Sequence, residues 1–146
     1  MEIKFTLDEG AYPPIKAHEN DAGFDLRAMF DSTGLLDVLG EEIFDTGVHV
    51  EIPKGCVGYV QGRSGLNFNN GLICPTGTVD CGYVGSIKVK LYNMRKDSGM
   101  QTPEIKAGDK IAQLVIHPIA DTGMMLQVEV LEDTERGDGG FGSTGR

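Results

Sequence analysis

Apolar and polar residues alternate with period two in three parts of the chain. Val48, Val50 and Ile52 are separated by His49 and Glu51. Successive side chains of a strand point to opposite faces, so this alternation predicts strands with one buried face. The same pattern recurs where Ile87, Val89 and Leu91 alternate with Ser86, Lys88 and Lys90, and where Leu126, Val128 and Val130 alternate with Gln127 and Glu129.

Shorter β-prone runs cover residues 3–7, 57–61 and 111–117, and turn residues at 53–55, 76–77, 97–99, 107–109 and 121–123 separate the runs. Only residues 64–70 favour a helical turn or two, with Ser64 as its N-cap. No internal repeat or linker is evident. The pattern therefore predicts an all-β, jelly-roll-like β-sandwich with one short helix.

The last eleven residues, RGDGGFGSTGR, have almost no means of burying themselves, because five of them are glycines. Composition alone favours a disordered tail. The segment also carries a guanidinium at Arg136, an aromatic ring at Phe141 and hydroxyls at Ser143 and Thr144, a combination that suits a lid over a phosphorylated, ring-bearing molecule. We expect a β domain over residues 1–135 and a mobile arm over 136–146.

Composition narrows the class of protein. With 146 residues, 40% hydrophobic residues and 21 glycines, the chain has the size of one domain rich in tight turns. The net charge of −9 argues against a sequence-independent grip on nucleic acid, which needs a basic face. Three cysteines without a Cys-x-x-Cys pair suggest neither a disulfide framework nor a zinc site. The start of the chain has no uninterrupted apolar run, so we expect a soluble, cytoplasmic protein with no membrane span.

Histidine gives no metal-site signal, because His18, His49 and His117 lack ligand spacing. Chemistry is more readily placed in five glycine-containing stretches with polar groups that strand propensity does not require. These are AGFDL (22–26), GRSGL (62–66), GTVDCGYVG (77–85), GDKIAQL (108–114) and the tail.

The stretch GTVDCGYVG predicts a tight hairpin in which the Asp80 carboxylate and the Tyr83 ring share a concave surface. Backbone groups there can bond the edge of a base while the ring packs on a sugar. The alternative is an ordinary Gly-rich hairpin in which Asp80 bonds the turn amides.

The other three stretches allow two interpretations each. Arg63 and Ser64 either converge with backbone amides on phosphate oxygens or form a capped helix start with a surface arginine. Asp25 lies on the opposite strand face from Phe24 and Leu26, so it is either solvent-facing or holds a metal-bound water. Gln113 is either an ordinary edge residue or a ligand of phosphate and water.

Taken together and in this order, the five stretches closely resemble the ordered motifs of the trimeric deoxyuridine triphosphate nucleotidohydrolases, the dUTPases. The resemblance runs from residue 22 to residue 145. It implies hydrolysis of dUTP to dUMP and pyrophosphate, with Mg²⁺ across the triphosphate and water attacking the α-phosphorus. The product would supply the dTMP precursor, and the reaction would keep uracil out of DNA.

The resemblance also assigns roles at the nucleoside end. Asp80 would be the general base, Tyr83 would pack on the deoxyribose and exclude a 2′-hydroxyl, and backbone near Lys88 together with residues 77–79 (Gly77, Thr78 and Val79) would bind uracil.

At the phosphate end, Arg63, Ser64 and Gly65 would bind the phosphates with help from Gln113, and Asp25 would bind the metal through water. In the tail, Arg136 would hold the γ-phosphate and Phe141 would cover uracil. Gly142, Ser143 and Thr144 would add phosphate contacts.

The resemblance further implies a homotrimer whose sites are built from different chains. Three positions depart from the commonest family pattern, namely Phe24 for Tyr, Gly62 for Pro and Asp138 for Glu. Of these, Gly62 is expected to loosen the turn that aims Arg63 and Ser64, and so to weaken substrate binding. The related dCTP deaminases are the alternative enzyme class. A regulatory protein partner is a further hypothesis, which rests on the unassigned residues 31–42.

Overall fold

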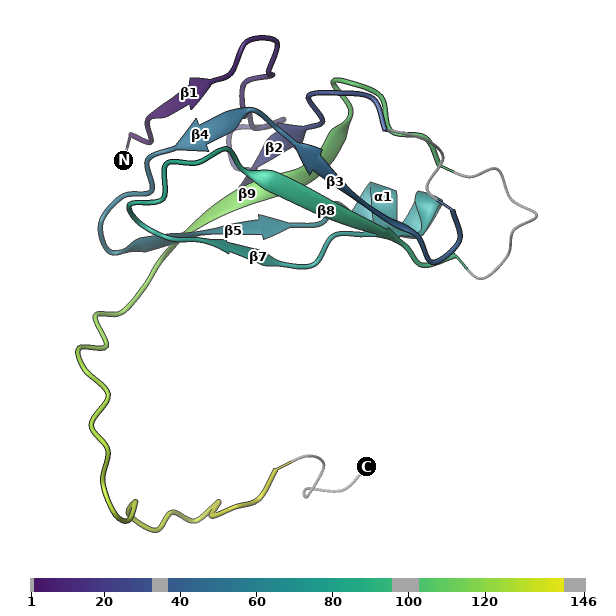
Figure 1. Cartoon of the computed structure of the whole chain (residues 1–146). Helices are drawn as coiled ribbons and strands as arrows, with labels where there is room; N and C mark the ends of the chain where they lie inside the picture. Colours follow the sequence, from purple (N-terminus) through teal and green to yellow (C-terminus); the bar gives the residue numbers. More distant parts are fainter. Residues whose placement is uncertain (1, 33–36, 96–102, 141–146) are drawn as a thin grey trace.

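The computed structural model of the chain describes residues 2–32, 37–95 and 103–140. Its strands form three antiparallel sheets (Figure 1). The prediction of an all-β fold with one short helix is confirmed.

The largest sheet has the order β2-β9-β5-β7. Its strands are β2 (Gly23–Arg27), β9 (Lys110–Pro118), β5 (Cys56–Gln61) and β7 (Gly77–Val79). The second sheet has the order β3-β8-β6, with β3 at Glu41–Asp45, β8 at Lys88–Asn93 and β6 at Leu72–Ile73. A two-stranded ribbon pairs β1 (Phe5–Leu7) with β4 (Val48–Val50).

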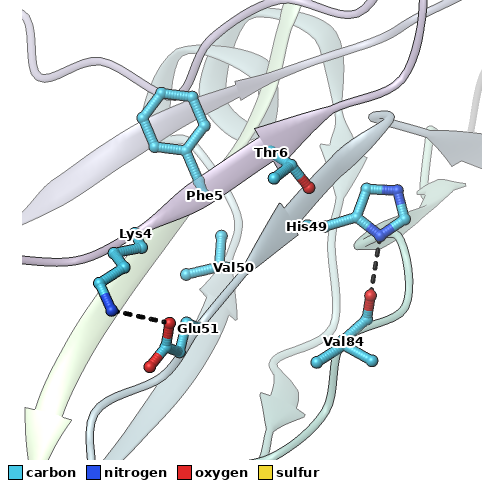
Figure 2. Close-up of a pocket in the computed structure, with 7 residues that line it drawn as sticks. All are labelled: Lys4, Phe5, Thr6, His49, Val50, Glu51 and Val84. Atoms are coloured by element: carbon cyan, nitrogen blue, oxygen red, sulfur yellow. Dashed lines mark hydrogen bonds and ion pairs between the residues drawn. The ribbon is translucent and has the colours of Figure 1, made fainter.

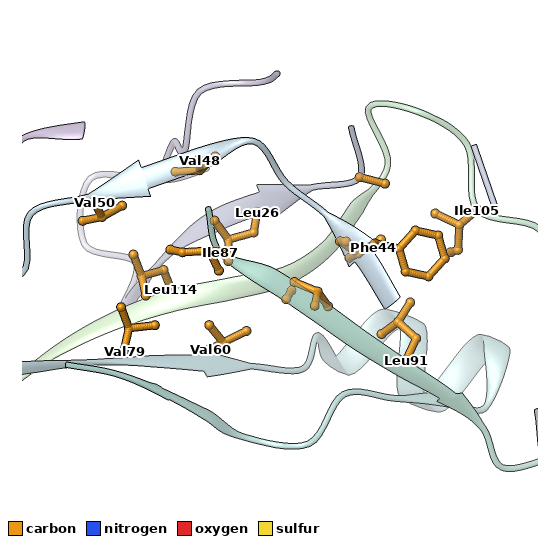
Figure 3. Close-up of a cluster of buried hydrophobic side chains, with 14 of the residues drawn as sticks. Leu26, Phe44, Val48, Val50, Val60, Val79, Ile87, Leu91, Ile105 and Leu114 are labelled. Atoms are coloured by element: carbon orange, nitrogen blue, oxygen red, sulfur yellow. The ribbon is translucent and has the colours of Figure 1, made fainter. Parts of the chain in front are cut away.

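The hydrophobic core fills the space between the four-stranded and three-stranded sheets (Figure 3). Leu26, Val60 and Leu114 enter it from one side, and Phe44 and Leu91 from the other. All five side chains are buried. The period-two pattern therefore identified the inward faces of β4 and β8 correctly.

The helix α1 (Ser64–Asn70) has the predicted position but a different start. Arg63 is its N-cap residue and makes no capping hydrogen bond with its side chain, so the prediction of Ser64 as N-cap is wrong. The helix ends at Gly71, whose positive φ of 63° suits the left-handed conformation that glycine adopts without strain. Within the described residues, no helix is long and apolar enough to cross a bilayer.

Residues 77–85 do not form the predicted hairpin. β7 pairs with β5, whereas β8 pairs with β3 and β6, so the two strands belong to different sheets. Gly77 begins a strand and is not a turn residue. Residues 80–87, here called the inter-sheet loop, therefore cross from one sheet to the other.

The predicted strand over residues 126–130 is wrong for the isolated chain. After β9, residues 119–140 run away from the β-sandwich as an extended segment, here called the arm (Figure 1). Large apolar side chains along it are exposed, namely Met124, Met125, Leu126, Val128, Val130 and Leu131. Alternation marks which face of a strand would be buried, but a strand also needs a paired neighbour, and no described segment of this chain lies beside the arm.

Candidate functional site

The predicted site residues of the β-sandwich, with the exception of Asp80, line two cavities. A polar cavity of about 240 Å³ is lined by Asp25, Arg63, Ser64, Gly65 and Gln113. A second cavity of about 250 Å³ is lined by Gly77, Thr78, Val79, Tyr83 and Lys88. The fold thus separates the residues predicted for phosphate and metal from those predicted for the nucleoside.

Strand register brings the polar residues of the first cavity together. Asp25 on β2 pairs with Gln113 on β9, and Gln113 pairs with Gln61 on β5. Side chains at paired positions of adjacent strands share one face. Since Leu26 and Leu114 face the core, this polar row faces away from it.

Gln113 is not an edge residue, because β9 lies between β2 and β5. Its Nε2 lies 3.5 Å from the carbonyl oxygen of Gly62, the residue before Arg63. A Cβ atom at position 23 would lie 2.8 Å from Gln113 Oε1, which is too close. Glycine at this position therefore makes space for the side-chain amide of Gln113.

Asp25 lies on the strand face predicted for it, but it is not solvent-facing. Only 7% of the residue is exposed. Arg63 Nη1 donates to Asp25 Oδ1, and Lys110 Nζ lies 2.7 Å from Oδ2. One buried carboxylate thus holds two cations, of which Arg63 lines the polar cavity and Lys110 does not. The same carboxylate fixes the guanidinium of Arg63 directly before α1.

Lys110 was missed by the sequence reasoning. It belongs to the stretch GDKIAQL and begins β9, where it pairs with Arg27 at a register shift between Leu26 and Arg27. The available signal was the position of Lys110, directly before the apolar residues of the motif GDKIAQL. What Lys110 contacts depends on the pairing of β9 with β2, which the sequence did not predict.

The second cavity lies where the edge strand β7 approaches the start of β8. Val60, Ser86 and Ile87 complete its lining. β7 pairs on one side only, with β5, so part of its backbone N–H and C=O groups is left for a ligand. A flat ring can therefore be recognised by backbone groups in this cavity.

Asp80 and Tyr83 lie in the inter-sheet loop, and both are exposed. The amide of Tyr83 donates to the carbonyl oxygen of Asp80 over 3.1 Å, and the Tyr83 hydroxyl donates to the carbonyl oxygen of Ser86 over 3.1 Å. These bonds fold the loop on itself, so the carboxylate and the ring are held in one turn.

The end of the loop is attached to the corner between β3 and β4. The hydroxyl of Ser86 donates to Asp45 Oδ1, and Lys88 Nζ lies 3.7 Å from Asp45 Oδ2. Burial opposes ionisation of Asp45, but hydrogen bonds from Ser86 and the Gly47 amide, with the charge of Lys88, outweigh it and lower the pKa of the carboxyl below its usual value. Ser86 and Asp45 were not found from the sequence, because neither lies in a motif-like context.

Of the predicted tail residues, the structure describes Arg136, which lines neither cavity. Arg136 is exposed, and its Nε donates to the carbonyl oxygen of Gly139 over 2.9 Å. Phe141, Gly142, Ser143 and Thr144 lie outside the described residues. Among the described residues, no group of three or more His, Cys, Asp or Glu side chains is arranged to hold a metal ion.

Comparisons with known proteins point to one family. The deoxyuridine 5′-triphosphate nucleotidohydrolase of Clostridium kluyveri is 40% identical to the chain, and the match covers 95% of this chain and 94% of that protein. The one from Corynebacterium glutamicum is 42% identical, over 96% of this chain and 91% of that protein. The dUTPase of Staphylococcus bacteriophage 80alpha, solved with dUpNHpp, has a TM-score of 0.85 at 30% identity and 99% coverage of both chains.

A dUTPase from phage phi11 of S. aureus, whose structure describes coordination of a structural Mg(II) ion, has a TM-score of 0.79 at 29% identity, over 91% of this chain and 100% of that one. The dUTPase family model matches residues 10–145, which include both cavities and the arm. On this match and these identities, the chain belongs to the dUTPase family.

Proposed function

We propose that the protein hydrolyses dUTP to dUMP and pyrophosphate. The observation that carries the proposal is the division of the predicted residues between a cavity beside the free edge of β7 and a polar cavity that contains Arg63. The cavity beside β7 suits a base and its sugar, and the polar cavity suits a chain of phosphates.

In the cavity beside β7, backbone groups of residues 77–79 bind the edge of uracil. A base bound along a strand edge is recognised by shape and by a fixed pattern of donors and acceptors. Tyr83 packs on the deoxyribose, and its ring, 48% exposed here, leaves no room for a 2′-hydroxyl. Selection against ribonucleotides and thymine nucleotides follows from these two contacts.

In the polar cavity, Arg63, Ser64, Gly65 and Gln113 hold the phosphates. A guanidinium supplies two parallel donors to phosphate oxygens. Arg63 enters the site already oriented by Asp25, so less of its rotamer freedom is lost when the substrate binds. The guanidinium, together with a bound Mg²⁺, would let a protein of net charge −9 bind a polyanion.

The oxygen ligands that Mg²⁺ prefers are present in the polar cavity. Asp21 and Asp25 both line it. A Mg²⁺ ion keeps several waters and takes few protein ligands when it is carried by phosphates, so one carboxylate contacting its water shell is enough. When bound, the ion would neutralise the charge of the triphosphate, and Asp25 would orient its waters.

The chemical step needs one proton acceptor. Asp80 accepts a proton from the attacking water, the new bond forms at the α-phosphorus, and pyrophosphate leaves with the electrons of the broken P–O bond. Positioning and charge neutralisation supply most of the acceleration in such reactions, so no covalent intermediate with the protein is required.

The sites are shared by the chains of a homotrimer. In a single chain the two cavities have different lining residues, and the apolar side chains of the arm are uncovered. Covering those side chains with other copies of the chain would remove a large apolar surface from water. The arm would then carry Arg136 and the residues after it to a site on a neighbour, where they act as a lid.

The proposal is tested by measuring pyrophosphate release from dUTP, dTTP, dCTP and UTP, with Mg²⁺ and after chelation. We expect turnover of dUTP alone, lost when the metal is removed. Asp80→Asn should lower kcat on the order of 10²- to 10⁴-fold while leaving the fold intact. Near-normal turnover of the variant would remove Asp80 from the role of base, and ammonia release from dCTP would assign the chain to deamination instead.

A further inference from the structure

His49 on β4 connects the inter-sheet loop to a distant part of the chain. Its Nδ1 lies 2.8 Å from the carbonyl oxygen of Val84 in the loop (Figure 2). Its Nε2 lies 3.1 Å from Oδ1 of Asp8, which directly follows β1. A single imidazole therefore bridges β4, the loop that carries Asp80 and Tyr83, and the turn after β1.

The two halves of the loop are supported differently. Its end is fixed to the corner between β3 and β4, because the Ile87 amide donates to the Val48 carbonyl oxygen over 2.9 Å and the Thr46 hydroxyl donates to the Ile87 carbonyl oxygen over 2.7 Å. Residues 80–84 are exposed. Within the described chain, the hydrogen bond that reaches residues 80–85 from outside the loop is the one from His49. The position of this half thus depends on one side chain.

Both partners of the His49 ring are acceptors. A neutral imidazole has a single N–H, so it satisfies either the Val84 carbonyl or the Asp8 carboxylate, whereas the imidazolium donates to both. Hydrogen bonds from the ring to the Val84 carbonyl and the Asp8 carboxylate and, less strongly, the negative charges of Asp8 and Asp45 raise the pKa of His49, and partial burial opposes them.

The charged groups around His49 come from three directions. Asp8 lies on the β1 side and Asp45 at the end of β3, where its oxygens already contact Ser86 and Lys88. Farther along the ribbon of β1 and β4, Lys4 and Glu51 pair with each other at 3.5 Å (Figure 2). The surroundings of the ring are therefore acidic, which favours its protonated form.

We infer that His49 is a positioning residue for the nucleoside cavity: through its bridge between Asp8 and Val84 it holds the loop that presents Asp80 and Tyr83. When the ring loses a proton, the remaining one stays on Nε2, because a hydrogen bond to a carboxylate is stronger than one to a carbonyl. The lone pair of Nδ1 then faces the Val84 oxygen, and the loop is released. This inference rests on the proposed function.

The direction of the pH effect follows from the raised pKa. The bridge is complete below the ordinary histidine pKa of about 6.5 and is lost as pH rises through the higher pKa of the folded protein. Release of the loop weakens the packing of Tyr83 on the sugar. The expected result is a higher KM for dUTP and poorer discrimination against UTP, with a smaller effect on kcat.

The kinetic test compares the wild-type protein with His49→Gln, Asp8→Asn and the matched control His117→Gln, between pH 6 and pH 9. Glutamine keeps a donor for Val84 but does not titrate, so the ratio of wild-type to His49→Gln KM values cancels titration of the substrate. This ratio should rise about three- to tenfold with pH, the effect of one hydrogen bond. Asp8→Asn should move the midpoint to lower pH, and His117→Gln should follow the wild type.

A second test does not depend on turnover. The Cε1 proton of His49 and the amides of Tyr83, Val84 and Ser86 are followed by NMR during a pH titration. We expect one shared midpoint in the wild type, and no such step in those amides of His49→Gln. Amides that ignore the titration of His49 would overturn the bridge. A shared midpoint together with identical KM profiles for wild type and His49→Gln would overturn the positioning role, and inactivity of the wild type toward dUTP would reject only the proposed function.

Discussion

The Asp25 carboxylate, with its two cationic partners, offers the sharpest test of how the polar cavity is built. Replacing Asp25 by asparagine keeps the shape of the side chain and removes its charge, which leaves Arg63 and Lys110 facing each other across an uncharged amide. Both cations are about one-third exposed, at 31% and 32%, whereas the carboxylate side chain is 9% exposed.

The size of the effect can be worked out from this geometry. Two unit charges 2.7 Å apart attract by roughly 6 kcal/mol at an effective dielectric constant of about 20. Much of this is offset by desolvation, and breaking a fully buried pair costs about 3–5 kcal/mol. Because both cations can turn toward water, we expect Asp25→Asn to lower the free energy of unfolding by about 2–3 kcal/mol. For a chain of this length, that lowers Tm by roughly 5–10 °C.

Urea unfolding at one fixed protein concentration measures the change, because the stability of an oligomer depends on concentration. Asp21→Asn is the matched control, since Asp21 lines the same cavity but is only partly buried. The double variant Asp25→Asn, Lys110→Met should recover part of the loss. If Asp25→Asn proves as stable as the wild type, the buried carboxylate does not hold the two cations and the reasoning fails.

Three further predictions concern the arm and the turn before α1. Removal of residues 136–146 should leave the urea midpoint unchanged and reduce kcat/KM for dUTP at least tenfold, whereas full activity would contradict the lid. Joint replacement of Leu126 and Val130 by aspartate should dissociate the trimer in sedimentation experiments, because both side chains are exposed and apolar in the single chain. The control is Gln127→Asp. An unchanged mass of the double variant would show that the arm is not an interface. Gly62→Ala should raise the free energy of unfolding by about 0.4–1 kcal/mol, because its Cβ would meet Cys74 at an ordinary 3.4 Å and its φ is not positive. A lower stability would show that the turn needs glycine.

Much of the fold could be predicted from local patterns. The alternation over residues 48–52 and 86–91 identified β4, β8 and their buried faces, because a half-buried strand requires period two whatever its partner. The helix over residues 64–70 was predicted from the same kind of local signal. The order of the five motifs was a property of the whole sequence, and it led to the family that the comparisons then showed.

Contacts between distant segments were decided only by the tertiary structure. The stretch 77–85 looks like a hairpin locally, yet the strands β7 and β8 pair in different sheets, because strand pairing depends on the whole topology. Asp25 was placed on the correct face of β2, but its burial depends on Arg63 and Lys110, which lie 38 and 85 positions away in the chain. The alternation at 126–130 defines an apolar face but not the surface that covers it.

By itself, the sequence determined which residues face a core, where short turns fall and which side chains carry chemistry, because these follow from backbone periodicity and residue type. The tertiary structure decided which of those side chains meet. His49 shows the difference: in the sequence it is one polar residue in an alternating strand, and in the folded chain its ring lies between a carboxylate and a carbonyl from two other segments. Such contacts depend on how the sheets pack, and no local pattern encodes them.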